Sequence, residues 1–338
     1  MLRKIIFAAL IVLLAGVSIL FYRNYVTKKA KEQEIIKLQS ESPKVLKFAL
    51  KNTGTSINTV APWVAMEKGL FKKHNLNVEF INVSNVADAL TTGAADVGTS
   101  GLFTITPAVI QGADLKWIAI IANNIPYALV STKPAEKIKR VGITQQTPSE
   151  FLNIIFNLNS IGIKREDVSF IVVGPPENQM LALANGKIDA ANIATGTYAT
   201  LTGKLKSEIE GKNIKVLFDI KDSTTPVNPV SLSATGKYLK NYPKSAVKLI
   251  LALKEANEYI LGHRQEAAAI FAKKAALKSE KDADPVIETY IQQLSGLSLK
   301  PNISTGQNIL NSLSTENPKA KSYNINNFID SSFTDNLK

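Results

Sequence analysis

The sequence contains no cysteine. This absence excludes disulfide bonds, thiolate-bound metal ions and a cysteine nucleophile. It also excludes anchoring to a membrane through a lipid-modified N-terminal cysteine. It does not decide the compartment, because proteins from oxidising and from reducing compartments can both lack cysteine.

Histidine is almost as scarce, and the sequence lacks the common catalytic motifs. His74 and His263 are the only histidines, and each lies beside basic residues. There is no H-E-x-x-H, no G-x-S-x-G and no P-loop. We therefore predict a protein that is not an enzyme and that uses neither a metal ion nor a cofactor.

The positive charge of the chain is spread out. The net charge is +12, from 40 Lys and Arg against 28 Asp and Glu. A nucleic-acid-binding surface needs a basic stripe with stacking aromatic rings, and the sequence shows none, so we expect no nucleic-acid partner. The lysines are typical of a solvated surface, and attraction to an anionic membrane or ligand is the alternative.

The N-terminus carries one long uncharged apolar run, residues 5–22, directly after Arg3 and Lys4. Eighteen apolar residues are enough for a membrane-spanning helix, and a preceding basic pair is also typical of a signal peptide. Bulky residues follow the small Gly16 and Ser18, which favours an uncleaved anchor. We predict a membrane anchor or signal segment over 1–26, a polar linker over 27–43 and a soluble part outside the cytoplasm, although the basic residues after the run oppose export.

From Lys44 onward, short strand-like runs alternate with helical ones, and the series starts again near Arg140. This alternation predicts an α/β fold with mostly parallel sheets and right-handed crossovers. After Ser231 the pattern becomes helical. The clearest helix is 243–262, which has Pro243 in its first turn and an apolar face formed by Ala246, Leu249, Leu253, Ala256 and Ile260.

One short frame, A-L-x-x-G-x-x-D, occurs twice, at 89–96 and at 182–189. In each copy we expect a helix that ends on a left-handed glycine, followed by a strand that begins at the aspartate. A single copy of this frame is common in α/β proteins and would predict nothing more. Two copies at equivalent places in two strand–helix series predict two similar lobes.

These segments resemble a known family. The run "APWVAMEKGLFKKHNLNVEF" (61–80) is similar to a signature of the solute-binding proteins of ABC transporters for nitrate, taurine, alkanesulfonates and thiamine-pyrimidine precursors. The two A-L-x-x-G-x-x-D segments and residues 238–260 resemble later parts of that family. The resemblance covers about 44–275, and residues 195–198 depart from it where many relatives carry an acidic residue and a proline.

The resemblance implies a two-lobed clamshell of the periplasmic-binding-protein type (type II) with two hinge crossovers. Lobe one would comprise 44–131 plus 232–338, and lobe two 132–231. The hinge strands would be 127–133 and 230–235. One small solute would bind in the cleft between the lobes.

Four polar loops follow predicted strands, and ligands of open α/β sheets bind beyond the carboxyl ends of strands. Ser, Thr and Gly also cap helices, so only the four loops together favour a polar ligand site. They contain no Lys or Arg, so anionic groups would be met by backbone N–H groups at helix N-termini. The candidate ligand-binding residues in these loops are Gly54, Thr55, Ser56, Thr99, Ser100, Gly101, Gln145, Gln146, Thr147, Thr195 and Tyr198.

Two aromatic residues, Trp63 and Phe103, lie just beyond two of these loops. Trp63 is a further candidate ligand contact, because an aromatic ring there can pack on a flat solute. An aromatic residue in this position is more often part of the core.

These observations predict an extracytoplasmic solute-binding component of an ABC importer. Its ligand would be a small polar or anionic solute, such as a sulfonate or nitrate. The expected partners are the transmembrane subunits of an ABC permease and the membrane, and the protein is expected to be a monomer. The alternatives are binding of a thiamine-pyrimidine precursor, an enzyme on the same fold, or a ligand-sensing ectodomain.

Overall fold

The computed structural model describes residues 23, 26, 42–51, 56–146, 148–223, 227–314, 317–335 and 337. The apolar run 5–22 and almost all of the predicted linker lie outside these residues. Within the described part of the chain, no helix has the length and apolar character needed to cross a membrane.

The first sheet has the strand order β2-β1-β3-β10-β4. Strand β1 is parallel to β2 and to β3, whereas β10 is antiparallel to β3 and β4. The strands of this sheet are β1 (Leu46–Leu50), β2 (Val78–Asn82), β3 (Val97–Gly101), β4 (Leu115–Ala122) and β10 (Val230–Thr235).

The second sheet has the equivalent order β7-β6-β8-β5-β9. Strand β6 is parallel to β7 and β8, and β5 is antiparallel to β8 and β9. The strands are β5 (Tyr127–Ser131), β6 (Arg140–Ile143), β7 (Ser169–Val172), β8 (Ala190–Ala194) and β9 (Lys215–Asp219). The prediction of mostly parallel strands is confirmed for strand direction, although both sheets are mixed: in each sheet four strands run the same way, and the one strand that enters directly from the other sheet runs against them.

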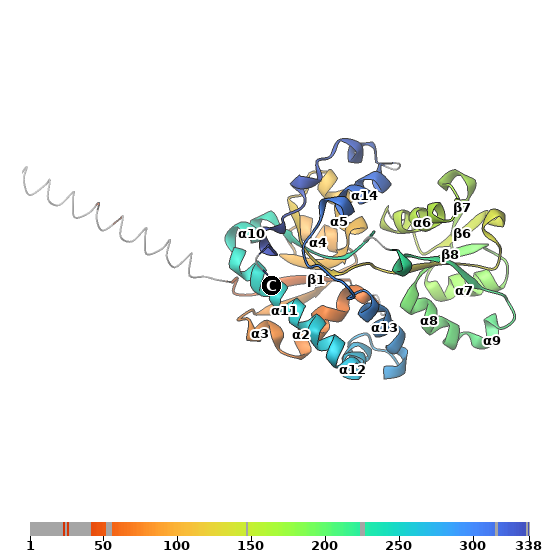
Figure 1. The fold of residues 1–338 in the computed structure, drawn as a ribbon, viewed down its shortest axis with the longest axis horizontal. Coiled ribbons are helices and arrows are strands. Elements are labelled where there is room, and N and C mark those ends of the chain that lie inside the picture. The colour runs from red at the N-terminus through yellow and green to blue at the C-terminus, as the bar shows by residue number, and fades with distance from the viewer. Residues whose placement is uncertain are drawn as a thin grey trace, which may run out of the picture.

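Those two antiparallel strands mark where the chain passes between the sheets, which form two lobes side by side (Figure 1). The chain leaves the first sheet after Ala122 and enters the second at Tyr127. It leaves the second sheet after Asp219 and returns to the first at Val230. The segment 127–131, which we expected to close lobe one, thus pairs within the second sheet.

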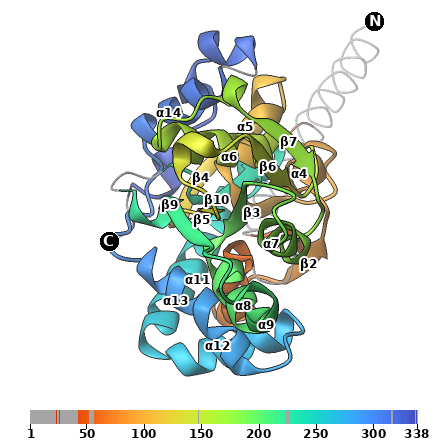
Figure 2. The ribbon, with the colours of Figure 1, turned by 90° about the vertical axis from the view of Figure 1, so that its right-hand side faces the viewer.

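Helices cover both faces of each sheet, as the view onto the second lobe shows (Figure 2). Two of them matter most for the fold of the first lobe: α2 and α11 pack on each other in its core. The predicted apolar face of α11 is confirmed, since all five of its residues have no exposed surface. The helices are α2 (Val60–Glu67), α3 (Leu70–Lys73), α4 (Val86–Thr91), α5 (Leu102–Ile110), α6 (Pro148–Ser160), α7 (Pro176–Ala184), α8 (Thr195–Lys204), α9 (Lys206–Ile209), α10 (Gly236–Asn241), α11 (Pro243–Gly262), α12 (Arg264–Lys274), α13 (Asp284–Gln292) and α14 (Ile303–Leu313).

The repeated frame forms the same structure in both lobes. Gly93 has φ +73° and Gly186 has φ +66°, so each glycine ends its helix in the left-handed region as expected. The following strands, β3 and β8, occupy the central position of their sheets. Each aspartate accepts backbone hydrogen bonds from the neighbouring strand: Asp96 Oδ2 from Lys47 N, at 3.0 Å, and Asp189 Oδ2 from Lys139 N and Arg140 N, at 3.0 and 2.8 Å.

The second aspartate is the more deeply buried of the two and is surrounded by cations. Burial raises the pKa of Asp189, but hydrogen bonds from Arg140, Lys133 and the backbone outweigh this effect and hold the pKa well below its usual range. The side-chain contacts are 2.8 Å from Arg140 Nη2 and 2.7 Å from Lys133 Nζ to Asp189 Oδ1. The ionised carboxylate of Asp189 therefore connects Arg140, at the start of β6, with Lys133, just after the end of β5.

Candidate ligand-binding site

A pocket of about 460 Å³ lies between the two lobes. Its walls come from the carboxyl ends of parallel strands in both sheets, as expected for an open α/β fold. Lys51 and the turn 56–58 follow β1, and Gly101 ends β3. Thr144 and Gln145 follow β6, and Ala194, Gly196 and Thr197 lie where β8 becomes α8.

The sequence-predicted residues fall into several groups. Ser56, Gly101 and Gln145 line the pocket. Gln146 is exposed and lies next to the lining residue Gln145. Three further predicted residues, Gly54, Thr55 and Thr147, lie outside the described residues.

Three predicted hydroxyl groups are directed to protein atoms. Thr99 Oγ1 donates to Asn58 O at 2.8 Å, and Ser100 Oγ donates to Gly101 O at 3.4 Å. Thr195 Oγ1 donates to the carboxylate of Asp219, 2.8 Å from Oδ2. In these positions the hydroxyl groups are bonded to the protein itself, and those of Thr99 and Thr195 join segments that are distant in the sequence.

The aromatic candidates lie in the cores. Trp63 is buried in the core of the first lobe, with its ring centroid 5.2 Å from that of Phe271. Phe103 is buried in a second core cluster of the same lobe. Tyr198 packs against the core of the second lobe, although Gly196 and Thr197, just before it, line the pocket.

Side-chain amides, which sequence reasoning missed, form much of the pocket wall. They are Asn58, Asn153, Asn192 and Asn228. Asn228 Nδ2 donates to Asn153 Oδ1 at 3.1 Å, and Asn228 Oδ1 accepts from Phe103 N at 3.2 Å. This amide therefore joins α6 of the second lobe to the start of α5 in the first.

Asn192 presents a hydrogen-bond donor whose identity follows from its neighbours. Asn157 Nδ2 lies 2.9 Å from the carbonyl oxygen of Tyr127, which can only accept, so this atom of Asn157 is a donor. It also lies 2.6 Å from Asn192, which must therefore direct its own oxygen to it. The other polar atom of the Asn192 amide is therefore Nδ2, which is a hydrogen-bond donor. The residue is only 8% exposed.

Two amide atoms of pocket-lining residues have no protein partner. Among the described residues, none bonds to Asn192 Nδ2 or to Asn58 Oδ1, although both atoms are buried. Asn58 Nδ2 donates to Ser56 Oγ at 3.1 Å, which fixes the orientation of that amide. A buried donor and a buried acceptor without protein partners are costly, and a polar molecule that came within hydrogen-bond distance of them would satisfy both.

The charged groups of the pocket are mainly acidic. Of the described lining residues, Lys51, Glu150 and Glu177 carry charge. Glu150 is in the first turn of α6, and its carboxylate accepts from Thr144 N at 2.6 Å and from Gln145 N at 3.0 Å. Two backbone donors in the loop between β6 and α6 are thus already occupied by a carboxylate.

One ionisable group at the back of the pocket stays neutral. Burial raises the pKa of the Tyr127 phenol to about 12, with a further contribution from the charge of Glu150. Within the described part of the chain, no group of His, Asp and Glu side chains is arranged to hold a metal ion. The site offers neutral polar groups, the carboxylates of Glu150 and Glu177, and the ammonium group of Lys51.

The two lobes and the pocket between them are the fold of periplasmic binding proteins, as solved structures show. The aliphatic sulphonate-binding protein SsuA from Escherichia coli has a TM-score of 0.65 and 19% identity, over 82% of this chain and 88% of its own. The alkanesulfonate-binding protein SsuA from Xanthomonas axonopodis pv. citri, bound to MOPS, has a TM-score of 0.63 and 15% identity over 82% and 94%. The nitrate-binding protein NrtA from Synechocystis PCC 6803 has a TM-score of 0.61 and 12% identity over 86% and 88%.

The family model described as NMT1/THI5 like matches residues 56–267, which is more than half of the sequence. The chain belongs to this family, and the resemblance seen in the sequence is confirmed. No curated protein matches the chain. The family match ends before α13, so the last helices of the first lobe lie beyond it.

Proposed function

We propose that this protein is the extracytoplasmic solute-binding component of an ABC importer, and that it binds one small polar solute between its lobes. The observation that carries the proposal is the pocket itself: it lies between two lobes and has buried amide groups on both of its sides. A small solute can reach both lobes at once only in such a place. The protein would act as a monomer and deliver the solute to the transmembrane subunits of a permease.

The pocket chemistry bears on the choice between the two ligand classes that the sequence left open. For a sulfonate or nitrate, the carboxylate of Glu150 would be an unfavourable neighbour, whereas Glu177 is paired with Lys204 at 2.9 Å and Lys51 lines the same pocket. For an uncharged solute with both a donor and an acceptor, such as a thiamine-pyrimidine precursor, Asn58 Oδ1 and Asn192 Nδ2 are suitable partners. The uncharged class is therefore favoured.

Thermal unfolding with a panel of solutes tests this proposal, because a ligand bound only by the folded protein raises the melting temperature. The panel contains taurine, ethanesulfonate, nitrate and bicarbonate on one side, and hydroxymethylpyrimidine, cytosine and uracil on the other. We expect stabilisation by an uncharged pyrimidine and none by the anions. Stabilisation by an anion alone would reverse the ligand assignment, and turnover of a bound solute would favour the alternative of an enzyme.

We also propose that residues 1–26 hold the protein on a membrane, with the lobes outside the cytoplasm. The support is the uncharged run 5–22 after Arg3 and Lys4, together with the periplasmic relatives of the same fold. Fractionation of cells that express the full chain or residues 44–338 tests this. The full chain should be found with membranes, and recovery of the full chain in the cytosolic fraction would contradict the proposal.

A further inference from the structure

Helix α13 is firmly attached to the first lobe. Tyr290 Oη donates to Asn257 Oδ1 at 2.7 Å, and Asn257 Nδ2 donates to the carbonyl oxygen of Ile121 in β4 at 2.9 Å. At the end of the helix, Asn123 N donates to Gln293 O at 3.0 Å. With Val286 and Tyr290 fully buried in the same core as α2 and α11, α13 moves as part of the first lobe.

The same helix lies against α8 of the second lobe, where the two ribbons are neighbours in Figure 1. The contact is made at Gly196. A Cβ at this position would lie 3.1 Å from both Cα and Cγ2 of Val286, which is closer than side chains normally pack. The φ of Gly196 is outside the left-handed region, so glycine serves the close approach of the two helices and not an unusual backbone conformation.

The contact between α8 and α13 is also an edge of the pocket. Gly196 and Thr197 line the pocket from α8, and Thr289 lines it from α13, one turn after Val286. A separation of the lobes at this edge would break the Gly196–Val286 contact and open the pocket between Thr197 and Thr289.

We propose that α13 is a latch: its Val286 holds the lobes together by packing on Gly196, and it thereby completes the solute pocket. The latch proposal rests on the proposed binding function, since both concern the same pocket. It assigns a role to a segment that lies outside the family match. Lobe motion in such a protein is a hinge movement between a few stable arrangements, so one misfitting methyl group at the latch shifts the equilibrium towards the open arrangement.

The absence of cysteine makes the test direct, because two introduced cysteines are then the only ones in the chain. Gln265 in α12 and Lys206 in α9 are exposed and lie on different lobes. Spin labels on Gln265→Cys and Lys206→Cys report the distance between the lobes by pulsed electron resonance, without any ligand. The parent should give one main short distance, and Gly196→Val should add a longer one.

Gly203→Val is the matched control, because it places the same side chain on the same helix. Apart from its chain neighbours and the backbone of its own helix, no described atom lies within 4 Å of a Cβ at Gly203, so the distance distribution of this variant should equal that of the parent. A folded Gly196→Val protein with the parent's distribution would overturn the proposal, as would a parent that is already mainly at the longer distance. If Gly196→Val does not fold, Gly196→Ala must show the longer distance instead. This experiment uses no solute. A negative result would therefore overturn the latch proposal without deciding the proposal of solute binding, which thermal unfolding tests separately.

Discussion

Asn157 Nδ2 and Asn192 Oδ1 are 2.6 Å apart, in a part of the second lobe where both side chains are buried. Asn157 has no exposed surface, and its amide connects the backbone of β5 to a side chain of the pocket wall. The orientation of Asn192 therefore depends on a residue that does not line the pocket itself.

The first prediction concerns this buried amide. Asn157→Ala should lower the free energy of unfolding by about 1–3 kcal/mol, because it removes the buried donor that Asn157 supplies to Tyr127 O and to Asn192 Oδ1. Asn159→Ala, an exposed position on the same helix, should change it by less than about 0.5 kcal/mol. Urea unfolding of the three proteins measures both values. Equal stabilities of the two variants would show that the amide connection is unimportant.

The second prediction concerns the repeated aspartates. Asp189→Asn should destabilise the protein by about 2 kcal/mol at neutral pH, since charge-assisted hydrogen bonds are stronger than neutral ones. Asp96→Asn should cost less, because Asp96 is less buried and no side-chain ion pair is formed with it among the described residues. Chemical unfolding at pH 7 gives the comparison.

The pH dependence of this effect has a definite sign. Because the folded state lowers the pKa of Asp189, its contribution is fully present above the unfolded pKa, about 3.9, and is lost as the pH falls below that value. The stability difference between the parent and Asp189→Asn should therefore be constant from pH 7 to about pH 5 and shrink at lower pH. A difference that grows towards acid pH would contradict the assignment.

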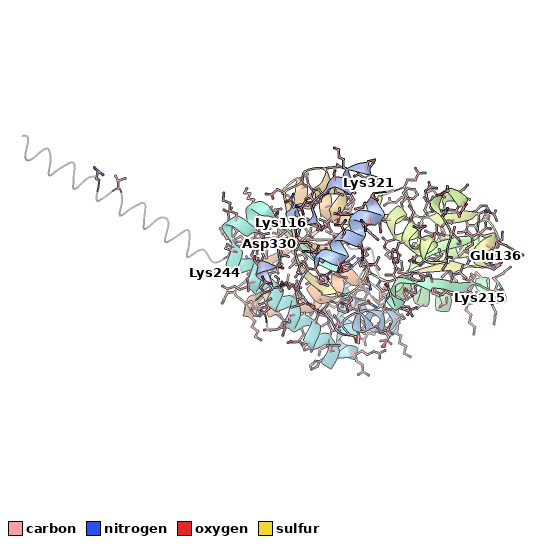
Figure 3. All side chains as sticks on the ribbon, turned by 45° about the horizontal axis from the view of Figure 1, so that its top comes forward. Lys116, Glu136, Lys215, Lys244, Lys321 and Asp330 are labelled. Atoms are coloured by element: carbon pink, nitrogen blue, oxygen red, sulfur yellow. The ribbon has the colours of Figure 1, made fainter. Side chains whose placement is uncertain are left out.

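The third prediction concerns the acidic wall of the pocket. Glu150→Gln removes one negative charge and should strengthen the binding of small anions by about 1 kcal/mol. Thermal shifts with sodium nitrate and sodium ethanesulfonate, against sodium chloride at equal ionic strength, measure this gain. Glu136→Gln is the control, since Glu136 lies at the far end of the second lobe (Figure 3). The same anion response in both variants would show that Glu150 does not influence the pocket.

Much of the fold could be predicted from the sequence because its signals are local. The glycine and aspartate of A-L-x-x-G-x-x-D fix a helix end and a strand start within eight residues, and the spacing of Ala246 to Ile260 fixes a helix face. The segments of β5 and β10 were expected as hinge strands, but their antiparallel pairing was not predicted, because their partners come from distant parts of the chain. Short runs such as 127–131 do not reveal which sheet they will join.

The pocket was predicted less completely, for a physical reason. The rule of strand ends leads to Ser56, Gly101 and Gln145, which line the pocket. The orientation of the Asn192 amide depends on its hydrogen bond with Asn157, a pairing that is visible only in three dimensions. The signal that could have identified Asn192 is a polar residue inside the apolar strand "AANIA" (190–194). Thr289 gave no such signal, because its role depends on how α13 meets the second lobe.

The central claim is that the buried amides of the pocket bind one small uncharged solute. Calorimetric titration of the solute with the largest thermal shift, into the parent, Asn192→Ala and Asn159→Ala, tests it most directly. We expect one site per chain, a loss of about 0.5–1.5 kcal/mol in binding free energy for Asn192→Ala, and no change for Asn159→Ala. A folded Asn192→Ala protein that binds the solute as tightly as the parent would contradict it.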